Sequence, residues 1–305
     1  MKKLILMVGL LALCIGANAQ YERVRDSLYK IGKYDRVYYL SEGFACVELN
    51  NKYGFIDKTG KEVIPLKYDD EGDFVKGFAK VKLKDKWGFI DTTGKEIIPL
   101  KYDKVSIFTE GFAGVELNSK WGFIDTTGKE VIPLKYDDEG YFIESFTKVK
   151  LKDKWGFIDT TGKEVIPLKY DNAGDFNEGF AKVKLNNKWG FINTTGKQIT
   201  PVKYDEVGYF KESFALVELN NKWGFIDTTG KEVIPLKYAY ASVFHEGFAR
   251  IKRNYKWGFI DTTGKEVIPP KYDFVYFFSK GFADVKLNGK DFTIDKSGKI
   301  VREYP

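Results

Sequence analysis

The chain has 305 residues, 30% of them charged, and a formal net charge of +6. Basic and acidic residues are interspersed, so the sequence offers no concentrated basic patch that would steer nucleic acid or a membrane surface. His245 is the one histidine, and this excludes a histidine-based zinc site or catalytic triad of the usual form.

Residues 1–19 have the pattern of a secretory signal peptide. Two lysines precede an apolar stretch, Leu4–Gly16, which is too short for a membrane span, and Ala17–Ala19 has the small-x-small form of a signal-peptidase site. We therefore expect cleavage after Ala19 and export of a soluble chain to the periplasm or the cell surface. Cys14 would be lost with this segment, so Cys46 would have no disulfide partner.

From residue 34 onward the chain repeats itself every 34 residues. Tryptophan marks the period at positions 87, 121, 155, 189, 223 and 257, with Tyr53 one interval earlier and Asp291 one interval later. A period of this length predicts stacked repeats or a propeller rather than one globular core. Residues 20–33 are interpreted as a leader or cap. The eight repeats, numbered 1 to 8 below, cover residues 34–67, 68–101, 102–135, 136–169, 170–203, 204–237, 238–271 and 272–305.

Repeat 2 shows the elements expected in each unit. Phe78–Leu83 alternates apolar and polar residues, Lys86–Asp91 is rich in aromatic and β-branched residues, and Glu96–Leu100 is a third short apolar segment. These patterns predict three strands. The pair Lys84-Asp85, which is often Asn-Asn in other repeats, predicts a type I′ hairpin turn, and Asp91–Gly94 predicts a second turn. The expected class is all-β, built from three-stranded meanders.

Each meander carries apolar residues on both faces, so it needs neighbours on both sides to be stable. We expect Trp87 and its equivalents to be core residues, with a neighbouring tryptophan or backbone packed closely over Gly88. Pro99 and its equivalents predict that the third strand lies at a sheet edge or is broken at the proline. In repeat 8, Asp291 and Thr293 replace the two large aromatic residues, as suits an uncovered end. These features favour an open, twisted array over the alternative of a closed β-propeller.

The motif Lys-Trp-Gly-Phe-Ile-Asp-x-x-Gly-Lys-x-Val-Ile-Pro, followed by Tyr-Asp and then Gly-Phe-Ala, resembles the WG repeat, the KWG-type β-repeat of bacterial proteins. The resemblance covers Tyr34 to about Pro305, with departures at Tyr53 in the first unit and at Asp291–Thr293 in the last. It implies a role in export or interaction, with no settled activity and no catalytic residues to carry over.

Acidic loops follow the Tyr-Asp pair in several repeats. Asp69–Asp73 and Asp137–Gly140 could supply oxygen ligands to calcium, but their spacing fits no known calcium loop. We therefore expect solvated turns, with no metal and no cofactor. Asp-Thr-Thr-Gly-Lys superficially resembles motifs of aspartic proteases and aspartyl-phosphate enzymes. Because it recurs in nearly every repeat, we interpret it as a plain turn.

Aromatic residues crowd the loops of the last two repeats. Tyr238, Tyr240, Phe244, Tyr276 and Phe277 are candidate binding residues, because exposed rings could stack on sugar rings or on a peptide. The alternative is that these rings seal the end of the array.

These features together predict an exported, non-enzymatic scaffold that binds a protein, glycan or envelope partner and no nucleic acid. Catalysis needs an asymmetric cluster of different groups, whereas this chain repeats one set of residues. The alternatives are a structural spacer of defined length in the cell envelope and a hydrolase that uses paired carboxylates.

Overall fold

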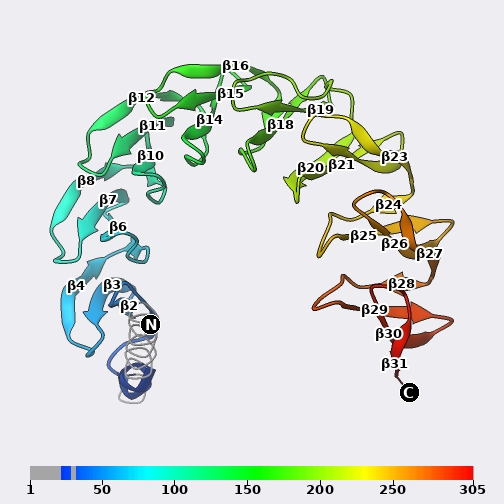
Figure 1. Cartoon of the computed structure of the whole chain (residues 1–305). Helices are drawn as coiled ribbons and strands as arrows, with labels where there is room; N and C mark the ends of the chain where they lie inside the picture. The colour runs from blue at the N-terminus through cyan, green and yellow to red at the C-terminus, as the bar shows by residue number, and fades with distance from the viewer. Residues whose placement is uncertain (1–21, 29–31, 305) are drawn as a thin grey trace, which may run out of the picture. The chain divides into compact units, whose positions relative to one another are not determined.

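The computed structural model describes residues 22–28 and 32–304 (Figure 1). The chain divides into two compact units, residues 1–142 and residues 143–305, and each is described by itself. The predicted signal peptide, residues 1–19, lies outside the described residues. Across the part of the chain that the structure describes, no helix is both long enough and apolar enough to span a membrane.

The first unit contains three antiparallel sheets, with strand orders β1-β2-β3-β4, β5-β6-β7-β8 and β9-β10-β11-β12. Its strands are β1 (Arg36–Ser41), β2 (Phe44–Leu49), β3 (Lys52–Asp57), β4 (Glu62–Tyr68), β5 (Asp70–Glu71), β6 (Phe78–Leu83), β7 (Lys86–Asp91), β8 (Glu96–Tyr102), β9 (Lys104–Val105), β10 (Phe112–Leu117), β11 (Lys120–Asp125), β12 (Glu130–Tyr136) and β13 (Asp138–Glu139).

The second unit continues the pattern with one departure: the sheet β17-β18-β19 has three strands, so the predicted third strand around Pro201 is absent from the described residues of repeat 5. Figure 1 shows the sheet β24–β27 beside the sheet β28–β31. Its strands are β14 (Phe146–Leu151), β15 (Lys154–Asp159), β16 (Glu164–Tyr170), β17 (Asn172–Ala173), β18 (Phe180–Leu185), β19 (Lys188–Asn193), β20 (Glu206–Lys211), β21 (Phe214–Leu219), β22 (Lys222–Asp227), β23 (Glu232–Tyr238), β24 (Tyr240–Ala241), β25 (Phe248–Arg253), β26 (Lys256–Asp261), β27 (Glu266–Tyr272), β28 (Phe274–Val275), β29 (Phe282–Leu287), β30 (Lys290–Asp295) and β31 (Ile300–Glu303). The all-β prediction is confirmed, and no described sheet closes on itself.

The three predicted strands and both predicted turns of each unit are present in repeat 2. Strands β6 and β7 pair from Phe78 opposite Asp91 to Leu83 opposite Lys86. The intervening residues Lys84 and Asp85 have φ values of 50° and 62°, as a type I′ turn requires.

Each described sheet also has a further edge strand that the sequence did not predict; it has two residues in six of the sheets and six residues in β1 and β20. In repeat 2 this is β5, which pairs Asp70 with Lys82 and Glu71 with Val81. The acidic segment that we expected to be a solvated loop therefore begins as a sheet edge. Two residues are too few for an alternating pattern to be recognised, so the sequence does not distinguish this strand from a loop.

Only glycine fits at position 88, because the backbone of the neighbouring strand in the same sheet leaves no room for a side chain. A Cβ atom on Gly88 would lie 2.4 Å from the carbonyl oxygen of Ile98 and 2.8 Å from that of Pro99. The backbone of β8 bulges at this point, because its register with β7 shifts between Trp87 and Phe89. The close backbone contact was predicted, but it comes from the edge strand of the same repeat rather than from a neighbour. Of the two predicted alternatives for the proline strand, the edge position is confirmed for β8, which continues through Pro99 to Tyr102.

Successive sheets are joined by an inserted phenylalanine. The ring of Phe74 lies 5.0 Å from that of Phe44 and 4.9 Å from that of Phe55 in the preceding repeat. In the second unit Phe210 lies 4.5 Å from Phe180 and 4.9 Å from Phe191. The buried layer between sheets is therefore built mainly from phenylalanine, isoleucine, valine and the first tyrosine of each repeat.

Trp189 is buried at 9% exposure, as predicted, but the other tryptophans are less buried than predicted. Trp87 and Trp155 are only partly buried, whereas Phe89 and Phe157 are buried at 2% and 1% exposure. A lysine covers the outer side of the indole, with Lys80 Nζ 5.0 Å from the ring centroid of Trp87. The tryptophan therefore stands at the border between the core and the surface.

A helical stretch over residues 22–28 covers the first sheet. Leu28 is buried against Ala45, Val47 and Ile56, and Val24 packs at the border of the same cluster. The sequence predicts a leader or cap over residues 20–33 but does not predict the helical conformation of this stretch.

Candidate functional site

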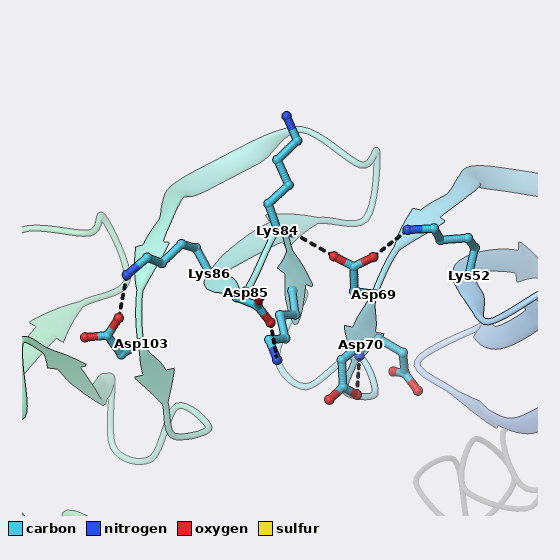
Figure 2. Close-up of polar contacts among 9 residues, drawn as sticks. Lys52, Asp69, Asp70, Lys84, Asp85, Lys86 and Asp103 are labelled. Carbon is cyan, nitrogen blue, oxygen red and sulfur yellow. Dashed lines mark hydrogen bonds and ion pairs between the residues drawn. The ribbon is translucent and has the colours of Figure 1, made fainter.

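One aspartate in each of most repeats joins that repeat to the one before it (Figure 2). Asp69 of repeat 2 accepts a hydrogen bond from Lys52 Nζ of repeat 1 at 2.5 Å through Oδ1, and one from the backbone N–H of Lys84 at 2.7 Å through Oδ2. These two hydrogen bonds lower the pKa of Asp69 below its ordinary value. We call this arrangement the lysine–aspartate linkage.

The linkage recurs between most neighbouring repeats. Its other lysine–aspartate pairs are Lys86–Asp103, Lys120–Asp137, Lys154–Asp171, Lys188–Asp205 and Lys256–Asp273. The backbone N–H groups bonded to the second carboxylate oxygen include those of Asn118, Asn186, Asn220 and Asn288. Both carboxylate oxygens are therefore used, one by the preceding repeat and one by the aspartate's own hairpin turn.

Repeat 7 lacks this aspartate, because Ala239 stands at the position of Asp205 in repeat 6. The local backbone is unchanged: Ala239 N–H donates to the Lys252 carbonyl at 2.9 Å, as Asp205 N–H donates to the Glu218 carbonyl at 2.8 Å. Lys222, the equivalent of Lys188, has no ion pair with any described carboxylate. The missing group is thus a carboxylate, whereas the lysine of the linkage and the local backbone hydrogen bond are retained.

A groove opens where the carboxylate is missing. It has a volume of about 880 Å³ and is lined by Lys222, Lys237, Ala239, Tyr240, Arg250, Lys252, Arg253, Asn254, Tyr255, Trp257 and Phe274. We call it the repeat-7 groove. Its lining contains five basic side chains, four aromatic side chains and no carboxylate. A groove of this size is large enough for a small-molecule ligand or a few sugar rings.

The aromatic side chains of the groove form a row. The ring centroids of Tyr240 and Trp257 lie 5.2 Å apart, and those of Trp257 and Phe274 lie 5.7 Å apart, both edge to face. Trp223 extends the row at 6.5 Å from Tyr240. Tyr255, in the hairpin turn, is 88% exposed. The row exposes apolar ring surface beside the basic groups.

The basic side chains differ in how far they are already paired. Arg253 is bound to Glu266 by two parallel hydrogen bonds of 2.8 and 2.9 Å. Arg250 donates to the Val275 carbonyl at 3.2 Å and lies 3.7 Å from the centroid of Phe277. Burial lowers the pKa of Arg250. Arg250 has no carboxylate partner among the described residues, and the same holds for Lys252, whose Nζ lies 5.3 Å from Trp257.

The candidate binding residues predicted from the sequence fall into two groups. Tyr240 lines the groove, and Tyr276 and Phe277 lie near it at 61% and 39% exposure. The prediction is wrong for Tyr238 and Phe244, which are buried at 0% and 1% exposure. They hold the same positions in the repeat as other buried tyrosines and phenylalanines, so they belong to the core between repeats.

The acidic motifs serve the fold. Asp91 Oδ1 accepts hydrogen bonds from Thr93 N–H, from the Thr93 hydroxyl and from Lys95 N–H, so the interpretation of Asp-Thr-Thr-Gly-Lys as a turn is confirmed. Within residues 22–28 and 32–304, no group of three or more His, Cys, Asp or Glu side chains is placed to hold a metal ion. The acidic residue Asp69 is engaged in the linkage instead.

Comparisons with solved structures return weak similarities. The crystal structure of a eukaryotic initiation factor has a TM-score of 0.46 and 10% identity, over 89% of this chain and 88% of that one. Kluyveromyces lactis Hsv2 has a TM-score of 0.39 and 8% identity, over 86% and 95%. The dihydro-heme d1 dehydrogenase NirN has a TM-score of 0.35 and 12% identity, over 84% and 71%. All three TM-scores lie below 0.5, so these similarities indicate nothing about the ligand or the activity of the chain.

No curated protein matches the chain. The profile of the WG containing repeat matches it eight times, over residues 32–53, 53–87, 87–121, 121–155, 155–189, 189–223, 223–257 and 257–290. Each internal match runs from one tryptophan, or its equivalent Tyr53, to the next. The chain therefore belongs to the family of WG containing repeat proteins.

Proposed function

We propose that this protein is an exported, non-enzymatic scaffold that binds a partner of the cell envelope through the repeat-7 groove. The observation that carries the proposal is the convergence of four sequence departures on one surface. Ala239, Tyr240, Arg253 and Tyr255 occupy the positions of Asp205, Glu206, Leu219 and Asn221 in repeat 6, and all four line the groove.

These departures all make the surface more basic or more aromatic. Repeat 7 lacks the acidic residues that repeat 6 has at the positions of Ala239 and Tyr240. It gains a basic residue, Arg253, and two aromatic rings, Tyr240 and Tyr255. In repeat 6, Asp205 links the repeat to its neighbour and Leu219 packs at the border of the core. Replacing both in the same repeat favours a binding role for this surface, because it exposes rings and positive charge together.

Export is part of the proposal and rests on the signal-peptide pattern of residues 1–19. The competing function is that of a spacer whose useful property is its length. A spacer does not need the surface of repeat 7, so the two functions make different predictions for a variant in which that surface is removed.

The test is co-sedimentation of the purified chain with cell-envelope material of the producing bacterium. The matched control is a variant in which repeat 7 takes the residues of repeat 6: Ala239→Asp, Tyr240→Glu, Arg253→Leu and Tyr255→Asn. We expect the wild type to sediment with the envelope material and the variant to remain in solution, with unchanged circular dichroism. Equal sedimentation of both proteins would contradict binding through this groove.

A second variant separates binding through the groove from binding through the repeated surface. Deletion of residues 68–135 removes two complete repeats of the first unit and leaves every residue of the groove in place. A groove-dependent binder keeps its affinity for the envelope material in this variant. A loss of binding that follows the number of repeats would instead favour recognition by the repeated surface as a whole.

A further inference from the structure

We propose that the repeat-7 groove binds an acidic oligosaccharide, and that a carboxylate on a sugar ring takes the place of the aspartate that repeat 7 lacks. The proposal rests on the binding function proposed above and names the ligand class for the same site. The juxtaposition that carries it is that of Ala239 with Lys222 and Asn254, which line the same groove as the aromatic row of Tyr240, Trp257 and Phe274.

The two donors at the vacant position form a ready-made carboxylate site. In repeat 6, Asp205 accepts from Lys188 Nζ with one oxygen and from the Asn220 N–H with the other, at 2.8 Å. Lys222 and Asn254 occupy the corresponding positions in repeat 7, and both line the groove. A bound carboxylate therefore finds an ammonium group and a backbone N–H, which suit its two oxygens.

The rings beside this site favour a sugar. A pyranose ring has an apolar C–H face that loses water favourably against aromatic side chains. Tyr240 and Tyr255, which are 40% and 88% exposed, offer accessible ring surface. The aromatic row continues from Trp257 to Phe274, so more than one sugar unit can lie along it.

The remaining basic groups favour a ligand with several negative charges. Lys237, Arg250 and Lys252 line the same groove as Lys222. An oligomer of uronic acid carries one carboxylate on every ring, so it presents charge and apolar surface in alternation. A peptide with a single terminal carboxylate would use Lys222 and leave the other cations unmatched. The groove therefore fits an acidic oligosaccharide better than a peptide with a single carboxylate.

The experiment uses the full chain and tetragalacturonate as the probe, with isothermal titration calorimetry at low ionic strength. We expect one binding site, with an affinity that falls as salt is added. Ala239→Asp supplies the missing carboxylate from the protein itself. It should weaken binding by about 10- to 100-fold, the range for loss of charge-assisted hydrogen bonds.

Two controls make the result specific. Lys222→Gln removes one donor without adding a negative charge, and it should also weaken binding. The methyl ester of the same tetrasaccharide keeps the rings and lacks the charges, and it should bind far more weakly than the acid. Unchanged circular dichroism and an undiminished melting temperature of Ala239→Asp would show that the fold is intact.

A matched variant in the neighbouring repeat tests the role of the rings. Asp205→Ala exposes the equivalent donors, Lys188 and Asn220, but Glu206 stands where repeat 7 has Tyr240. We expect no second site of comparable affinity. A second, equally strong site would contradict the contribution assigned to the aromatic row.

The outcomes separate the ligand class from the proposed function. If tetragalacturonate binds equally well to wild type and Ala239→Asp, or to neither, the carboxylate proposal is overturned. The binding function still stands in that case if envelope material is retained by the wild type and lost by the fourfold variant. If a C-terminal peptide carboxylate competes more strongly than the oligosaccharide, the site is a carboxylate site for a protein, and the sugar assignment is wrong.

Discussion

The junction between repeats 5 and 6 and the junction between repeats 6 and 7 share a core and differ at the surface. Both contain the inserted phenylalanine, with Phe210 at 4.9 Å from Phe191 and Phe244 at 4.7 Å from Phe225. Only the first has the lysine–aspartate linkage, because Ala239 replaces the aspartate in the second.

The comparison shows that the two kinds of contact are separable. Burial of a large aromatic side chain contributes several kcal/mol, whereas an exposed ion pair contributes little. Asp205 and Lys188 are both substantially exposed. One junction can therefore lose its linkage without losing its packing, and the two donors that are released become available to a ligand.

The largest expected effect concerns what the junctions share. Phe210→Ala and Phe244→Ala should each lower the free energy of unfolding by about 3–5 kcal/mol, because each removes a fully buried ring. Urea unfolding followed by circular dichroism measures both values. If Phe244→Ala left the free energy of unfolding unchanged while Phe210→Ala lowered it, the two junctions would not share a core. Phe244 would then be a surface residue, as the sequence suggests.

A smaller effect concerns acid sensitivity. The hydrogen bonds from Lys188 and Asn220 lower the pKa of Asp205 in the folded state. A carboxylate whose pKa is lower in the folded state contributes its full stabilisation when the pH is above its unfolded-state pKa, which is about 3.9. This contribution is lost as the pH falls through the folded-state pKa. Asp205→Ala should therefore lower the urea midpoint at pH 7 and have no such effect well below the folded-state pKa.

The contradicting result for the acid experiment would be an equal decrease at both pH values. That result would mean that Asp205 acts through its uncharged contacts, and that the absence of the aspartate in repeat 7 leaves no charge-specific site.

The smallest effect on stability is a reciprocal change at the two junctions. Asp205→Ala removes a linkage and should lower the melting temperature slightly, while Ala239→Asp adds the missing one and should raise it slightly. Differential scanning calorimetry of the two variants and of the double variant measures both changes. A decrease for Ala239→Asp would show that Lys222 or Asn254 is not positioned to receive a carboxylate.

Much of the fold could be predicted because local signals agree. The alternation in Phe78–Leu83 and the aromatic run in Lys86–Asp91 each correspond to a strand, and Lys84-Asp85 forms the expected turn. The short strand β5 was missed because two residues carry no period. The partial burial of Trp87 was missed because composition alone does not show that Lys80 covers the indole.

The site could be predicted only in part. The aromatic character of Tyr238 and Phe244 suggests binding residues, but a strict alignment of the repeats places them with Tyr204 and Phe210, which are buried. The same alignment reveals Ala239 as the one departure from aspartate at its position. The sequence alone does not show that Ala239 removes a lysine–aspartate linkage, because the lysine partner in an intact linkage lies 17 residues away in the preceding repeat.

The most direct measurement of the central claim is an acetate titration of the full chain labelled with ¹⁵N-asparagine and followed by two-dimensional NMR. The backbone amide of Asn254 should shift in a saturable manner, because its carboxylate acceptor is absent. The amide of Asn220, already bonded to Asp205 at 2.8 Å, should remain unchanged at the same ionic strength. Equal shifts of both amides, or no shift of Asn254, would contradict a vacant carboxylate site in repeat 7.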